Sequence, residues 1–297
     1  MAESTSGPVH VDERLLRSWS LPEPGSSKAA RGTVLIVGGS ARVPGAMYLA
    51  GEAALRVGAG KLQVVTTDSV ARQLAVALPE ALVHRSEEAP SGDIATYAAD
   101  DVCELADAAA SVLLGPGMMR PDDAEALLAR VLPRLGDQHV VVDALGSAAV
   151  TADRACLHHL TNTPVLTLNP SEIAHVLDVE EDEVRDDPVK ASTRLSDDAR
   201  AVVLCGGSGK VVAAPDGRTW RITTGGPGLG ISGSGDVQSG LVAGLLARGA
   251  EPEQAAVWGG WLHGHVGDVL AERVGPVGFL ARELPAEVPP ALAQLSR

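Results

Sequence analysis

Residues 224–246 read TGGPGLGISGSGDVQSGLVAGLL, a glycine-dense loop that runs directly into an apolar helix expected over about residues 237–247. The first turn of a helix leaves backbone N–H groups uncovered, and the helix macrodipole favours an anion there. Gly233 and Gly235 can adopt backbone angles closed to other residues, and Ser234 can donate one more hydrogen bond. The stretch therefore predicts a cradle for a phosphate or another anion.

Asp236 stands at the start of that helix and has two interpretations. An acid at this point can simply stabilise the helix dipole. It can also act as a general base that takes a proton from a substrate hydroxyl as the hydroxyl attacks phosphorus. The density of glycines favours the second interpretation. Residues 228–233 also fit G-x-G-x-x-G, but this motif comes late in the chain, and Asp236 follows too closely to be the ribose-binding acid that a Rossmann fingerprint has about 20 residues on.

Composition narrows the class of protein. The chain has 297 residues, 45% of them hydrophobic, which suits a globular enzyme with a substantial core. Lys and Arg number 24 against 38 Asp and Glu, and the net charge of −14 argues against nucleic acid or an anionic membrane as the main partner. Phosphate ligands stay possible, because backbone N–H groups can bind them without net positive charge.

The cysteines and the first residues suggest a cytoplasmic protein. Cys103, Cys156 and Cys205 lie far apart without C-x-x-C spacing, which favours reduced thiols. Residues 1–27 are predicted to be a polar leader without a signal-peptide core, and residues 28–297 a single catalytic domain. No apolar run reaches the roughly 20 residues of a membrane span. Apolar helices such as residues 46–57 leave room for a homo-oligomer.

Short apolar runs alternate with helix patterns along the domain, which predicts a mostly parallel sheet in an α/β sandwich of three layers. Strands are expected at residues 33–37, 62–66, 111–114, 139–142, 164–168 and 201–204, with a hairpin over 210–214 and 219–223. Helices are expected over residues 46–57, 121–132, 237–247 and 252–271. Acidic residues 180–187 are expected to form a solvated loop or helix end.

Polar and glycine-rich segments follow these strands, where parallel sheets bind their ligands. They are residues 38–40, 115–117, Asp143, 169–172 and 205–209. Several of these have a simpler interpretation. Residues 115–117 can simply form a tight turn. Asp143 can cap the next helix, Asn169 before Pro170 can cap another, and Cys205 can be a small buried residue. The histidines, His263 among them, are interpreted as packing or surface residues, and Trp258 and Trp261 as packing residues.

The ordered set of loops resembles the ADP- or ATP-dependent NAD(P)H-hydrate dehydratases of the ribokinase-like superfamily. The likeness covers roughly residues 27–270 in the same order. It rests on GTVLIVGGS (32–40), PGA (44–46), AALRVGAG (53–60), LGPG (114–117), VDA (142–144), residues 228–246 with GSGD (233–236), and HG (263–264).

The resemblance implies a ribokinase-like fold and a kinase-like first step. A phosphoryl group passes from ADP or ATP, bound with Mg²⁺, to the ring hydroxyl of hydrated NADH or NADPH. Phosphate then leaves and the reduced nicotinamide is restored. By position Asp236 would be the base. The adenine nucleotide would contact Cys205, Gly206, Gly207, Ser208, Gly209, Gly233, Ser234 and Gly235, and the hydrated nicotinamide would contact Ala46, Gly117, Asn169 and Asp236.

Two departures from the family pattern leave alternatives open. The family has Lys-Gly where this chain has Cys205-Gly206, and Lys210 is expected to lie too far along the chain to replace that cation. The family's Pro-His-x-x-Glu loop reads Leu168 to Glu172 here, with Asn169 in place of the histidine. Asn-x-x-Glu is similar to the loop by which sugar and vitamin kinases organise magnesium-bound water, so Glu172 could bind Mg²⁺ through water. A small-molecule kinase and a catalytically weakened nucleotide sensor are therefore the alternative functions.

Overall fold

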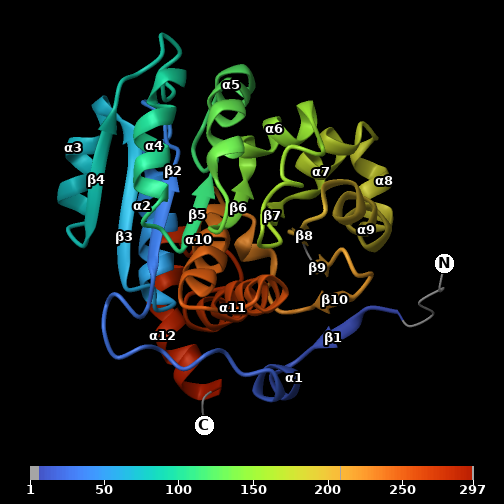
Figure 1. Ribbon diagram of the computed structural model, residues 1–297. Coiled ribbons are helices and arrows are strands. Elements are labelled where there is room, and N and C mark those ends of the chain that lie inside the picture. Colours follow the sequence, from blue (N-terminus) through green and yellow to red (C-terminus); the bar gives the residue numbers. More distant parts are fainter. Residues whose placement is uncertain (1–6, 208, 296–297) are drawn as a thin grey trace.

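The computed structural model describes residues 7–207 and 209–295 and contains one ten-stranded sheet (Figure 1). The strand order is β1-β10-β9-β8-β7-β6-β5-β2-β3-β4, and every neighbouring pair is parallel except those that include β9. The strands are β1 (Val9–Val11), β2 (Thr33–Val37), β3 (Lys61–Thr67), β4 (Ala81–Ser86), β5 (Ser111–Leu114), β6 (His139–Asp143), β7 (Val165–Leu168), β8 (Val202–Cys205), β9 (Lys210–Ala213) and β10 (Thr219–Ile222).

Helices cover both faces of the sheet, which confirms the predicted three-layer sandwich (Figure 1). Alternate residues of β2 enter two separate cores, Val34 and Ile36 one, Leu35 and Val37 the other. The first core includes residues of α2 (Gly45–Arg56), α3 (Asp68–Ala77), α10 (Ser234–Ala247), α11 (Pro252–Arg273) and α12 (Leu284–Leu295). The second includes residues of α4 (Ala99–Ala106), α5 (Pro121–Val131), α6 (Ser147–Ala152), α7 (Pro170–Leu177), α8 (Glu181–Asp186) and α9 (Pro188–Ala199).

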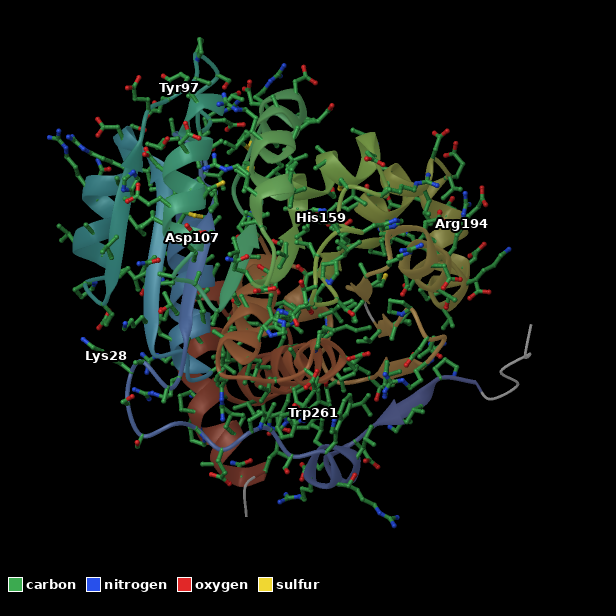
Figure 2. All side chains as sticks on the ribbon, viewed as in Figure 1. Lys28, Tyr97, Asp107, His159, Arg194 and Trp261 are labelled. Atoms are coloured by element: carbon green, nitrogen blue, oxygen red, sulfur yellow. The ribbon has the colours of Figure 1, made fainter. Side chains whose placement is uncertain are left out.

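The expected central strands are confirmed, two of them with the predicted bounds, and the hairpin is β9 and β10. The structure adds the two edge strands, β1 and β4, that the sequence pattern did not indicate. The acidic stretch forms the short helix α8, whose Val184 is fully buried. Trp258 and Trp261 are buried residues of α11, as expected of packing residues. Trp261 is labelled in Figure 2.

Part of the expected polar leader belongs to the folded sheet, which corrects that expectation. Val9 and Val11 pair in parallel with Trp220 and Ile222 of β10, and α1 (Glu13–Ser18) buries Leu16. Trp19 stacks on Trp220 with ring centroids 5.9 Å apart. A strand of three residues and a helix of six are too short to show a hydrophobic period, so the polar composition concealed both.

Close packing of α2 against α10 positions the glycine-dense loop. A Cβ atom at Gly240 would lie 2.2 Å from the carbonyl oxygen of Ala50, and one at Gly244 would lie 2.6 Å from that of Ala54. Only glycine permits such an approach between two helix backbones. The two helices therefore hold the N-terminus of α10 at the carboxyl ends of the central strands, next to β6 and β7.

None of the helices in the described part of the chain combines the length and the apolar character that a membrane span requires. Cytoplasmic localisation stays a prediction.

Candidate active site

A cavity of ≈ 770 Å³ lies at the carboxyl ends of β6, β7 and β8. The glycine-dense loop and the start of α10 form one side of this cavity. His263 of α11, a helix in the same layer as α10, also lines it. The lining residues with polar side chains or with backbone open to a ligand are Asp143, Thr167, Asn169, Glu172, Gly206, Gly207, Lys210, Gly233, Ser234, Gly235, Asp236 and His263. The cavity thus gathers most of the residues predicted to form the site.

The predicted left-handed backbone angle is present at Gly233 but not at Gly235, which is a regular residue of α10. Gly233 is the N-cap of α10 with a φ of +89°, a left-handed angle that favours glycine. A Cβ atom there would also lie 2.4 Å from Cδ1 of Leu49. Asp236 stands in the first turn of α10, where N–H groups are uncovered. The carboxylate and the cradle are therefore neighbours at one helix end.

The Asp236 carboxyl group titrates unusually for an aspartate. Burial, and secondarily the charge of Glu172, raise its pKa to about 6. In the described part of the chain its carboxylate makes no hydrogen bond, so its oxygens are available to a ligand. Such a group is ionised at neutral pH and yet basic enough to accept a proton during reaction.

Asn169 and Glu172 form a capping box at the start of α7. The Asn169 side-chain oxygen accepts the Glu172 N–H at 3.0 Å, and Glu172 Oε2 accepts the Asn169 N–H at 2.9 Å. The helix-cap interpretation of Asn169 is therefore confirmed. The capping box accounts for the local structure of this pair, and the role of Glu172 in binding Mg²⁺ through water stays a prediction. Both side chains still line the cavity.

Asp143 is a buried carboxyl group on the floor of the cavity. It begins the short turn Ala144–Gly146 but makes no side-chain cap bond there. Thr167 Oγ1 donates a hydrogen bond to it at 2.8 Å. Burial, with further contributions from the charges of Asp236 and Glu172, raises its pKa well above the usual range. The interpretation as a simple helix cap is therefore wrong, and Asp143 belongs to the site.

Two lining residues were missed by sequence reasoning. Lys210 was expected to lie too far along the chain, but its side chain is buried in the cavity wall. His263 was interpreted as a packing residue; its Nε2 lies 2.9 Å from the Ser234 hydroxyl oxygen. Burial, followed by the charge of Lys210, lowers the His263 pKa well below its usual value, so the ring is neutral. For Lys210 the signal is proximity through the fold, which no local pattern reveals; for His263 a local signal existed in the HG match at residues 263–264.

The remaining predicted site residues lie elsewhere. Cys205 is buried at the end of β8, and neither it nor Gly209 lines the cavity. Ser208 lies outside the described residues. Ala46 and Gly117 lie beside each other, since a Cβ at Gly117 would be 2.8 Å from Cβ of Ala46, but they are not part of this lining. Their assignment to the substrate stays a prediction.

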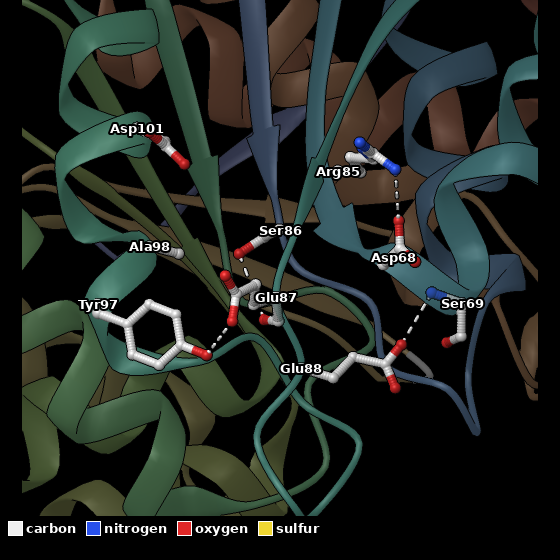
Figure 3. A pocket seen from close by; sticks show the side chains of 9 residues that line it. All are labelled: Asp68, Ser69, Arg85, Ser86, Glu87, Glu88, Tyr97, Ala98 and Asp101. Carbon is white, nitrogen blue, oxygen red and sulfur yellow. Dashed lines mark hydrogen bonds and ion pairs between the residues drawn. The ribbon is translucent and has the colours of Figure 1, made fainter.

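A second cavity, of ≈ 720 Å³, lies at the carboxyl ends of β3 and β4 (Figure 3). Its polar groups already pair with one another: the Tyr97 hydroxyl donates to Glu87 at 2.7 Å, and Arg85 pairs with Asp68 at 3.4 Å (Figure 3). None of the described residues that line this second cavity is a glycine. The cavity beside Asp236 is therefore the candidate active site.

A doubly wound sheet with a glycine-rich helix start and an acid at its strand ends defines the ribokinase-like class of α/β proteins. A ribokinase-like superfamily protein from Enterococcus faecalis V583 has the same fold, with a TM-score of 0.83, 21% identity, and coverage of 100% of this chain and 99% of that one. The sequence pattern of NAD(P)H-hydrate dehydratases matches residues 34–290. The chain belongs to the NAD(P)H-hydrate dehydratase family.

Two relatives carry more specific names. The ADP-dependent (S)-NAD(P)H-hydrate dehydratase of Xanthomonas campestris pv. campestris is 44% identical over 289 residues, which are 97% of each chain. The ADP/ATP-dependent NAD(P)H-hydrate dehydratase of Bacillus subtilis, co-crystallised with ATP and Mg²⁺, is 25% identical with a TM-score of 0.83. That comparison covers 99% of this chain and 100% of the other. The likeness therefore extends over the whole domain.

Proposed function

We propose that this chain binds ADP or ATP in the cavity beside Asp236 and uses it to dehydrate hydrated NADH or NADPH, restoring the reduced nicotinamide. The observation that carries the proposal is the Asp236 carboxyl group, unpaired at the first turn of α10, with a pKa raised to about 6. The names of the Xanthomonas and Bacillus relatives support the choice of substrate and nucleotide.

The chemistry begins at the ring hydroxyl of the hydrated nicotinamide. Asp236 accepts the hydroxyl proton while the oxygen attacks the terminal phosphorus of the nucleotide, and the bond from that phosphorus to the leaving oxygen breaks. The carbon–oxygen bond of the new phosphate ester then breaks, with the electron pair leaving on phosphate. Loss of one ring proton restores the double bond. The hydroxyl is phosphorylated first because hydroxide is a poor leaving group and phosphate is a good one.

The backbone around Gly233, Ser234 and Gly235 would stabilise the negative charge on the transferring group. Free N–H groups at a helix N-terminus point at such an anion, and they need no rearrangement during reaction. Gly206 and Gly207 line the opposite wall, where the nucleotide would lie. Asn169 retains its side-chain N–H₂ group for a substrate oxygen, because the capping box uses only its oxygen.

Mg²⁺ fits the donor set of this cavity when it is held mainly by the nucleotide. The described residues contain no cluster of three metal-ligating side chains, so the protein alone offers no closed metal site. Glu172 and Asp143 are oxygen donors with raised pKa values, and a nearby dication would favour their ionised forms. Glu172 would bind the ion through water, as predicted from the sequence. The ion would supply charge neutralisation between the phosphates.

The test is the growth of absorbance in the reduced-nicotinamide band when purified protein acts on hydrated NADH. With ADP or ATP and Mg²⁺ present, NADH should form and inorganic phosphate should appear in equal amount. With the nucleotide withheld, neither should appear. Release of phosphate without NADH would instead identify a nucleotide hydrolase. A phosphorylated product without NADH or free phosphate would identify a kinase, and binding of ADP without any product would identify a sensor.

A further inference from the structure

Lys210 occupies an unusual position for a lysine. It is the first residue of β9, paired with Ile222 of β10, and its side chain is only 3% exposed. Gly206 and Gly207, which follow β8 shortly before Lys210 in the sequence, line the same cavity. The Lys210 side chain is thus part of the wall of the candidate active site.

The ammonium group has few partners there. Its Nζ donates to the carbonyl oxygen of Thr224 at 3.4 Å, a long hydrogen bond. Within the described ranges, no carboxylate oxygen comes within 4.0 Å of it. Asp268 is the acid whose charge acts on the Lys210 pKa. Its carboxylate accepts a hydrogen bond from the Gly225 N–H at 2.9 Å. An ammonium has three donors, and the described residues use one of them.

Burial of an unpaired cation is unfavourable. Burial lowers the pKa of Lys210 to about 8, partly offset by the charge of Asp268. An apolar side chain of similar length would stabilise the fold better at this position. The donors that the described residues leave over therefore favour a partner from outside the chain.

The surroundings define the chemistry of that partner. Lys210 is the one cationic side chain among the described residues that line the cavity, which also contains three carboxyl groups. A Cβ atom at Gly225 would lie 3.3 Å from Nζ, so the ammonium lies directly against the glycine-dense loop. Cys205, at the adjacent strand end, cannot share the task, because burial raises its pKa to about 11 and keeps the thiol neutral.

We propose that Lys210 binds the phosphate groups of a nucleoside di- or triphosphate against the glycine-dense loop. The inference rests on the proposed function, since it takes the adenine nucleotide to lie in this cavity. It assigns to β9 the positive charge that the end of β8 lacks. It also explains why a lysine is buried where the fold gains nothing from its charge.

Calorimetric titration of the full chain with Mg-ADP and with adenosine tests the inference. Lys210→Met should weaken ADP binding by roughly 10- to 100-fold, the size expected for a lost charge-assisted hydrogen bond. Adenosine binding should stay the same, because adenosine has no phosphate. Lys61→Met is the matched control: Lys61 is exposed at the amino end of β3, and its variant should bind ADP as the unmodified chain does.

Thermal unfolding separates binding from folding. Without ligand, Lys210→Met should unfold at the same or a higher temperature than the unmodified chain, since a buried charge is removed. If Lys210→Met does not fold, Lys210→Gln serves in its place, because it keeps a polar group and removes the charge. Unchanged ADP affinity in a folded variant overturns the role of Lys210. Failure of the unmodified chain to bind ADP overturns the proposed function instead.

Discussion

Nε2 of His263 lies 2.9 Å from the hydroxyl oxygen of Ser234, and this contact joins α11 to the anion cradle. The other ring nitrogen, Nδ1, is buried without a partner. Orphaned buried N–H groups are rarer than orphaned acceptors, so we infer that the proton of the neutral ring is on Nε2. His263 then donates to Ser234, and the Ser234 hydroxyl proton is free to donate to an anion in the cavity.

This arrangement predicts a matched pair of variants. His263→Gln keeps a side-chain N–H near the position of Nε2 and should retain most nucleotide-dependent turnover. His263→Leu should lose about tenfold or more, because the Ser234 hydroxyl is no longer oriented. The loss should disappear in a Ser234→Ala background, as a double-mutant cycle would reveal. Additive losses from the two changes would show that His263 acts independently of Ser234.

The rate should depend on pH through Asp236. Its raised pKa of about 6 means that the base is ionised above that pH and protonated below it. We therefore expect kcat/KM to fall about tenfold per pH unit below the inflection. Because the charge of Glu172 contributes to the raised pKa, Glu172→Gln should shift the acidic inflection to lower pH. A profile that stays flat from pH 5 to 7 would rule out this carboxyl group as the base.

The same pKa shift predicts that the Asp236 carboxyl group weakens the fold. An acid whose folded-state pKa is raised stabilises the fold below its unfolded pKa, and loses that contribution as pH rises through the folded value. Asp236→Asn should therefore stabilise the protein at pH 8 by about 1–2 kcal/mol after allowance for partial solvent exposure. Thermal unfolding should show the gain shrinking between about pH 6 and pH 4. Equal gains at pH 5 and pH 8 would contradict the assignment.

Two glycines of α10 should respond differently to a methyl group. Gly240→Ala would place Cβ 2.2 Å from the Ala50 carbonyl oxygen and should cost about 1–3 kcal/mol in unfolding free energy. Gly235→Ala meets no atom within 4 Å and should leave the unfolding temperature unchanged. Since Gly235 lines the cavity, its methyl group should still weaken ADP binding. Parallel unfolding and titration measurements separate the two roles, and weakened stability in Gly235→Ala would be the contrary result.

Much of the fold could be predicted because the buried parallel strands are continuous apolar runs. β2 and β5 begin and end at the expected residues. The edge strand β4 could not be predicted, because its sequence ALVHRS is not an apolar run and the strand is only half-buried. β1 was missed because three residues carry no period. Edge strands satisfy weaker burial requirements, so their sequences are less distinctive.

The site was predictable where it depends on topology and not where it depends on packing. Loops after parallel strands meet at one edge, which is why Asp236, Asn169 and Glu172 line one cavity as expected. The pairing of Ser234 with His263, 29 residues apart, depends on how α10 and α11 pack. The approach of Lys210 likewise depends on the direction of its strand, which a short hairpin pattern leaves undetermined.

Turnover of hydrated NADH by the Asp236→Asn variant, followed in the reduced-nicotinamide band with Mg-ADP or Mg-ATP, tests the assignment of the base most directly. Titration of the same sample with Mg-ADP shows whether the cavity is intact. We predict nearly unchanged ADP affinity and a rate reduced roughly 100- to 10,000-fold, the contribution typical of a positioned general base. A variant that binds ADP and keeps more than about a tenth of the original rate would contradict the role of Asp236.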